Sequence, residues 1–363
     1  MKRVPLKWVG LSLVSLIVAQ SASAATFCVN TPAELQTALS TARANNADDV
    51  IRIKSGTYAT SSGLSAFIYS DAESFDLTLQ GGWQTVVMFD CGRRVDDPRA
   101  TVLSGSDARR GLNMLPSSGS TGAIVIENLT IRDGLITDTS SGAGLKISGT
   151  NYTGNVRLER VYFHNNVSGT FAGGASVTTG GTIELRNNWF RGNRCDSNHC
   201  GALIFNTVPA GNSIRTFVGN NTFVLNSCGA GALPSCATGG LGITGTARTS
   251  VHNNLFFSND VNDLAFTSGG ANVDVLFNNI GAIVGTPANS SGNVDLANPG
   301  FVNSLLGDYR LRFSSLLRDA GTGGFVLGSL DFDGVPRVNG NGVDIGAFEN
   351  DEIVFKDSFE FLQ

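Results

Sequence analysis

Short apolar segments recur through the middle of the chain, with a constant internal spacing and variable intervals between copies. Each complete copy carries apolar residues at its first and sixth positions and Asn or Arg at its third. The third positions lie 25 to 33 residues apart, a pattern typical of a solenoid with constant strands and variable loops. The copies are Ile126–Ile131, Leu158–Phe163, Leu185–Phe190, Val218–Phe223, Val251–Phe256 and a shorter Leu276–Ile280.

The spacing inside each copy predicts two short strands separated by a bend. Side chains at positions one and six would face inward, and Asn suits the bend because it tolerates left-handed backbone angles. Coils stacked about 4.8 Å apart place equivalent residues on top of one another. We therefore expect a stack of Phe163, Phe190, Phe223 and Phe256 and a ladder of Asn187, Asn220, Asn253 and Asn278.

These features predict an all-β fold, a right-handed parallel β-helix closed by an N-terminal helical cap and a C-terminal cap. The coils resemble the parallel β-helix repeats of the pectin-lyase-like superfamily over roughly residues 50 to 300. The resemblance implies a fold and not an activity. A β-sandwich or barrel is the alternative, but it would require tight antiparallel hairpins.

Both ends of the solenoid carry sequences suited to closing it. Thr31-Pro32-Ala33-Glu34 forms a capping box that opens a helix reaching about Ala44. We expect the cap and first coil at 25–60, the β-helix at 61–300, a C-terminal cap at 301–350 and a tail at 351–363. The block from Gly307 to Glu349 is similar to the C-terminal region of bacterial secreted β-helix proteins of the choice-of-anchor kind.

Residues 1–24 have the organisation of a signal peptide. Lys2, Arg3 and Lys7 precede an apolar run, and Ala22-Ser23-Ala24 supplies the small residues of a cleavage site. The run is short for a membrane span, and no later stretch is long enough either. We expect cleavage after Ala24 or Ala25 and a secreted or cell-surface protein without a transmembrane segment.

The amino-acid composition argues against nucleic acid as a partner and against some classes of structure. The 363 residues include 25 basic and 30 acidic side chains, so a basic face for nucleic acid is not expected. Hydrophobic residues at 41% exclude a wholly disordered chain. The 45 Gly and 32 Asn favour turns over long helices.

Six cysteines in an exported chain are expected to form disulfides. Pairing of neighbours, the simplest scheme, joins Cys195 to Cys200 and Cys228 to Cys236, leaving Cys28 for Cys91. The sequence leaves other connectivities open. A metal site at Cys195, His199 and Cys200 lacks a second ligand pair at zinc spacing.

The repeat also predicts an outward strip suited to an acidic sugar. Arginine binds carboxylates at two points, and aromatic rings stack on sugar rings. The alternative is an ordinary solvated face with aromatic residues packed under loops. The strip comprises Arg132, Tyr162, His164, Trp189 and Arg191, with Asp196 and His199 bordering it.

Two classes of function follow. The first is binding, adhesion or a structural role outside the cell, with an extracellular or cell-wall polysaccharide as the expected partner. The second is a polysaccharide lyase or glycoside hydrolase, although no Asp cluster occurs on consecutive coils. No cofactor is expected, since calcium ligation by Asp331, Asp333, Asp344 and Glu349 is less favoured than turn hydrogen bonding. The sequence does not define an oligomeric state.

Overall fold

The computed structural model describes residues 24–60, 65–71, 73–86, 89–209, 211–229, 236–266, 272–325 and 328–350. The predicted C-terminal tail and all but the last residue of the predicted signal peptide fall outside these ranges and stay predictions. Across the described ranges, no helix has the length and apolar character needed to cross a membrane.

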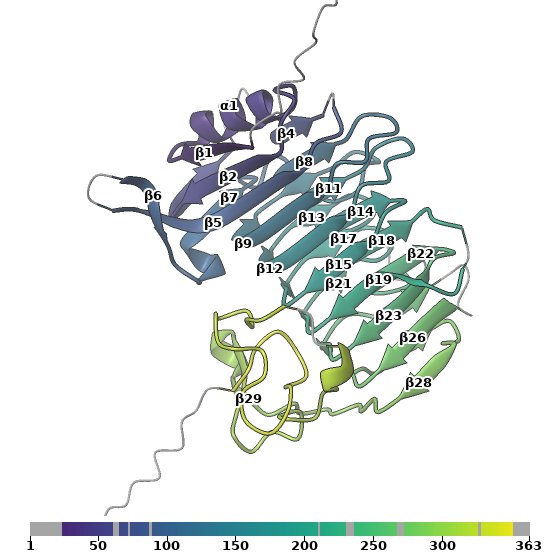
Figure 1. The fold of residues 1–363 in the computed structure, drawn as a ribbon. Helices are drawn as coiled ribbons and strands as arrows, with labels where there is room; N and C mark the ends of the chain where they lie inside the picture. The colour runs from purple at the N-terminus through teal and green to yellow at the C-terminus, as the bar shows by residue number, and fades with distance from the viewer. Residues whose placement is uncertain are drawn as a thin grey trace, which may run out of the picture.

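Parallel strands dominate the fold and form long sheets, which fits a parallel β-helix (Figure 1). The largest sheet has 16 strands, and most of its pairings join one coil to the next. Its main path is β1 (Ala25–Val29), β2 (Asp49–Lys54), β5 (Leu77–Val86), β9 (Ile124–Arg132), β12 (Val156–His164), β15 (Ile183–Arg186), β19 (Ile214–Gly219), β23 (Arg248–His252), β26 (Val273–Leu276) and β28 (Asn289–Ser291). Beside this path lie β3 (Gly56–Ala59), β6 (Phe89–Arg94), β7 (Thr101–Ser104), β16 (Trp189–Arg191), β20 (Thr222–Val224) and β24 (Leu255–Phe257).

Two further parallel sheets form other faces of the coils. The eight-stranded sheet contains β4 (Phe67–Ser70), β8 (Leu112–Leu115), β11 (Leu145–Ile147), β14 (Ala175–Thr179), β18 (Ala202–Asn206), β22 (Leu241–Gly245), β25 (Leu264–Phe266) and β27 (Ile283–Val284). The four-stranded sheet contains β10 (Leu135–Ile136), β13 (Val167–Ser168), β17 (Arg194–Cys195) and β21 (Ser227–Cys228). The apolar side chains that these faces turn inward form one continuous core.

The predicted phenylalanine stack is confirmed. Phe163, Phe190, Phe223 and Phe256 are buried, and successive rings lie nearly parallel with centroids 4.6, 4.6 and 4.9 Å apart. The rings stack because β12, β16, β20 and β24 place them at the same position of the parallel register.

The predicted asparagine ladder was assigned to the wrong member of each pair. Asn187, Asn220 and Asn253 occupy the left-handed bend, with φ of 55°, 56° and 54°. The following residue, the second Asn of each pair, forms the buried ladder by donating from Nδ2 to the Oδ1 of the next coil at 2.9 to 3.0 Å. Asn278 does belong to the ladder, because Phe277 takes the left-handed position in its coil. The ladder runs through Asn188, Asn221, Asn254, Asn278 and Asn293.

A second buried ladder was not predicted from the sequence. Asn166, Asn193, Asn226 and Asn259 repeat the same Nδ2-to-Oδ1 hydrogen bonds at 2.9 to 3.0 Å, at the bend that follows the phenylalanine position. Asn193, for example, also donates to the backbone carbonyl of Phe163 at 3.0 Å. These asparagines lie three residues after each Phe, outside the six-residue segments used to define the repeat.

The helix α1 (Pro32–Ala42) lies beside β1 at the N-terminal end of the solenoid (Figure 1). The hydroxyl of Thr31 accepts a hydrogen bond from the Glu34 N–H at 3.2 Å, as a helix cap requires. The residues that α1 buries are those expected from its apolar spacing: Leu35, Ala38, Leu39 and Ala42. The Gln36 side chain exchanges two hydrogen bonds with the backbone of Ile68 in β4, both at 2.9 Å.

The C-terminal region lies beside the lower coils in Figure 1, a different position from the end cap expected from the sequence. Among the residues described there, the named elements are the antiparallel pair β29 (Phe301–Asn303) and β30 (Asp308–Leu311) and two 3₁₀ turns, η3 (Ser304–Leu306) and η4 (Gly323–Phe325). Another 3₁₀ turn, η1 (Pro98–Ala100), precedes β7. The region packs against the outer surface of the coils, because apolar side chains on that surface are buried together with its own.

Replacing Phe190 with Ala should lower the free energy of unfolding by about 3 to 5 kcal/mol, because the cavity falls in the middle of the aromatic stack. Urea unfolding followed by circular dichroism measures this change. Phe205→Ala is the matched control, since Phe205 is 41% exposed on β18 and its truncation should cost less than about 1 kcal/mol. Equal losses in the two variants would contradict the register.

Candidate functional site

The outward columns predicted from the repeat exist in the structure. Parallel pairing aligns Thr130, Tyr162, Trp189, Thr222 and Leu255 in one column. The same strands align Arg132, His164, Arg191, Val224 and Phe257 in the neighbouring column. The five residues of the predicted binding strip therefore do lie next to one another along the coils.

Two residues of the strip are covered, which corrects the expectation of one exposed surface. Tyr162 and Trp189 stack with centroids 4.1 Å apart and are 7% and 4% exposed. Phe332 and Phe348 of the C-terminal region pack edge-on against Trp189 at 5.7 and 5.4 Å. The aromatic pair therefore belongs to a second hydrophobic core that joins the C-terminal region to the solenoid.

The three remaining strip residues are at least partly open. Arg132 pairs with Asp133 at 3.2 Å, and its side chain is 42% exposed. His164 is half-buried, and this desolvation lowers its pKa. Arg191 lies over the ring of Tyr309 at 5.6 Å and contacts the Tyr162 hydroxyl at 3.5 Å. No carboxylate of the described ranges lies within ion-pair distance of Arg191.

The C-terminal region and the solenoid together enclose a polar hollow of about 310 Å³ beside Arg191. Trp189 and Phe348 supply aromatic surface, and Gly307 and Tyr309, against which Arg191 packs, belong to its wall. The charged lining consists of Arg99 from η1, Asp308 and Arg310 from β30, and Asp333.

Ion pairs fix most of the charges in this hollow. Arg99 bridges Asp97 at 2.7 Å and Asp333 at 2.6 Å, and Arg310 pairs with Asp308 at 2.6 Å. Hydrogen bonding from Arg310 lowers the pKa of Asp308. Burial raises the pKa of Asp333, and the positive charge of Arg99 opposes that shift. The two carboxyl groups of one hollow are thus shifted in opposite directions.

The repeat pattern predicted the residues on one side of this hollow and did not predict those on the other sides. Trp189 and Arg191 follow from the repeat, whereas Arg99, Asp308 and Tyr309 lie far from them along the chain. The sequence indicates Asp333 only as a possible calcium ligand. No spacing in the sequence connects these segments, because the C-terminal region folds back across the coils.

The other carboxylates considered for calcium are engaged inside the C-terminal region. Asp331 accepts backbone N–H groups of Val335 and Glu349 on its two oxygens, both at 2.7 Å. Asp344 accepts two more at 2.8 Å each, and Glu349 pairs with the buried Arg337. Such contacts support a structural role for these side chains.

The short cysteine loops agree with the neighbour pairing. The structure contains the bonds Cys28–Cys91, Cys195–Cys200 and Cys228–Cys236. His199, which the sequence places between two cysteines at a possible metal site, is buried at a left-handed position with φ of 61°. Burial lowers the pKa of His199 to about 4.

Comparison of the chain with protein-family models and with curated proteins found no match in either case.

The buried His199 predicts a stability that decreases in mild acid. The unfolded chain takes up a proton near pH 6.5, whereas folded His199 takes it up only near pH 4. As pH falls through this window, the contribution of His199 to stability should be lost at up to about 1.4 kcal/mol per pH unit. Urea unfolding of the native chain and of His199→Asn between pH 7 and pH 4 measures the difference. Identical pH slopes would contradict a neutral buried imidazole.

Proposed function

We propose that the chain is an exported right-handed parallel β-helix protein of the pectin-lyase-like type that binds an acidic saccharide in its lateral hollow. The C-terminal region, of the choice-of-anchor kind, supplies the second half of that site. This function is a binding role at the cell surface or in the extracellular space, with a polysaccharide as partner. The long parallel sheets and the three disulfides are compatible with it.

One observation carries the proposal: Arg99 and Arg310 line the hollow, and a third arginine, Arg191, packs against its wall residues Gly307 and Tyr309. Of these three arginines, Arg191 alone lacks a carboxylate partner in the described part of the chain. Arg99 and Arg310 are neutralised by their aspartates, whereas Arg191 retains an uncompensated charge beside Gly307. A uronate carboxylate matches the planar donor fork of arginine at two points.

The remaining lining suits the rest of a sugar ring. Asp308 and Asp333 offer acceptors to hydroxyl groups, and Arg99 and Arg310 offer donors. Trp189 and Tyr309 belong to the wall of the hollow but are 4% and 3% exposed, so they offer a sugar only a small apolar surface. The chain as a whole is acidic, so long-range attraction of a polyanion is not expected and recognition depends on this local set of groups.

Replacing Arg191 with Gln should weaken binding of an oligogalacturonate probe by roughly tenfold or more, because a charged hydrogen-bonded contact is lost. Isothermal titration at two salt concentrations measures the effect, and the affinity of the native chain should fall with salt. The control is Arg132→Gln, an arginine of the same column that is already paired with Asp133. Equal effects of the two variants, or no preference over a neutral oligosaccharide, would refute the assignment.

A second candidate function is hydrolysis of a polysaccharide. The opposite pKa shifts of Asp308 and Asp333 resemble the division between an ionised and a protonated carboxyl group in glycosidases. In this case Asp333 would donate the proton to the leaving oxygen, and Asp308 would act as the base or nucleophile. Arg99 is the obstacle, since it must release Asp333 for the carboxyl group to be protonated.

The hydrolase alternative predicts that Asp333→Asn abolishes release of reducing sugars from acidic polysaccharides while the fold persists. A panel of acidic polysaccharides is assayed with and without calcium for both reducing sugars and unsaturated products. Unsaturated products indicate lyase cleavage, and their absence from the released sugars indicates hydrolysis. Asp196→Asn is the control, because Asp196 also pairs with an arginine, Arg194, but does not line the hollow. Absence of sugar release by the native chain across the panel would leave binding as the function.

A further inference from the structure

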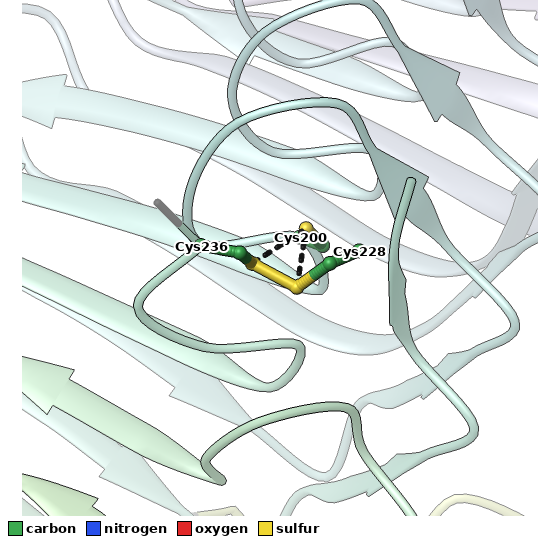
Figure 2. A group of neighbouring side chains, drawn as sticks. All are labelled: Cys200, Cys228 and Cys236. Atoms are coloured by element: carbon green, nitrogen blue, oxygen red, sulfur yellow. Dashed lines mark hydrogen bonds between the residues drawn. A yellow bond between two sulfur atoms is a disulfide. The ribbon is translucent and has the colours of Figure 1, made fainter. Parts of the chain in front are cut away.

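Four cysteines from two successive coils meet in one buried cluster. The strands β17 and β21 are paired in parallel with Cys195 opposite Cys228, and the bonded partners Cys200 and Cys236 follow five and eight residues later in the chain. Cys195 and Cys200 are fully buried, and Cys228 and Cys236 are 7% and 6% exposed. Figure 2 shows Cys200 facing the bond between Cys228 and Cys236.

The sulfur positions bring the two disulfides into contact. The Sγ atom of Cys200 lies 3.8 Å from the Sγ of Cys228 and 3.8 Å from the Sγ of Cys236. Exchange between the bridges requires a thiolate to approach along the sulfur–sulfur axis of its target. The Sγ of Cys200 is equally far from both sulfur atoms of the Cys228–Cys236 bond, so it lies to the side of the axis of that bond. The arrangement therefore does not favour exchange between the two disulfides.

The same distances suit a tetrahedral metal site. A tetrahedral zinc ion holds thiolates at about 2.3 Å, which separates neighbouring sulfur atoms by about 3.8 Å. The two contacts that Cys200 makes with the other bridge already have this length. The Sγ of Cys195 lies outside this group of three, whose sulfur atoms are all within 4.8 Å of one another. Reduction would free Cys195 from Cys200 and let it turn toward the ion, and would likewise let Cys228 and Cys236 separate. The sequence shows no second ligand pair at zinc spacing, because Cys228 and Cys236 join Cys200 only through the stacking of coils.

We propose that the reduced form of this cluster binds one soft divalent cation, such as Zn²⁺, through Cys195, Cys200, Cys228 and Cys236. Two equivalents of a phosphine reduce the two disulfides to four thiols, each equivalent giving two electrons and becoming a phosphine oxide with the oxygen of one water molecule, whose two protons go to the sulfur atoms. Two equivalents of a dithiol do the same, each giving two electrons and two protons and becoming a cyclic disulfide. The four thiols release those protons as thiolates when one cation binds. The site is therefore available only before the disulfides form or after they are reduced, and the oxidised chain excludes the metal.

The test uses the full chain carrying Cys28→Ser and Cys91→Ser, so that the four cluster cysteines are the only thiols. This chain is reduced with a phosphine under anaerobic conditions and titrated with Cd²⁺, which reports thiolate ligation by ultraviolet charge-transfer absorption. We expect saturation at one ion per chain and no such absorption from the oxidised chain. The matched control adds Cys228→Ser and Cys236→Ser, and it should lose saturation at one ion per chain.

A melting experiment separates a native site from thiols of an unfolded chain. Cd²⁺ should raise the Tm of the reduced chain, because a ligand bound to the folded state stabilises it, and should leave the Tm of the control unchanged. Equal absorption from the reduced chain and its control would overturn the proposal. A reduced chain whose sheet circular dichroism is lost and does not return with Cd²⁺ would overturn it as well.

Discussion

Each coil of the solenoid bends inside the protein, and every bend leaves backbone carbonyl groups that need donors away from water. The second asparagine of each pair meets this requirement. Asn188 donates to the Leu158 carbonyl at 2.9 Å, and Asn221 donates to the Leu185 carbonyl at the same distance. Each amide also bonds the asparagine of the following coil, so one side chain satisfies a bend and fixes the alignment of the next coil. The phenylalanine stack and both outward columns depend on that alignment.

The sequence predicted the features that depend on spacing within one coil. The inward phenylalanines, the outward pairs such as Trp189 with Arg191, and the buried face of α1 all follow from local periodicity. It did not distinguish Asn187 from Asn188, because the two residues are of the same type and only the backbone conformation separates their roles. Contacts between segments far apart in the chain could not be predicted from local spacing either. For this reason only the Trp189 side of the hollow was predicted.

The left-handed asparagines have a role outside the core. Asn187 donates to the Leu330 carbonyl at 3.0 Å, and Asn253 both donates to and accepts from the backbone of Thr322. Their amides therefore attach the C-terminal region to successive coils. The buried pair of Arg337 and Glu349 lies within the same region, and Arg337 reaches Asn187 at 3.2 Å. Removing either partner of this pair would leave an uncompensated charge in the interior, which is strongly destabilising.

In a solenoid whose coils contact only their neighbours, the ends can fray while the middle stays folded. The C-terminal region alters that behaviour, because it bonds at once to Arg99 near the start of the solenoid and to Asn187 and Asn253 several coils later. Opening any coil in this span disturbs contacts shared with the others. The lateral attachment thus couples the coils into one cooperative unit, in which backbone amides of widely separated strands should exchange with deuterium through a common opening.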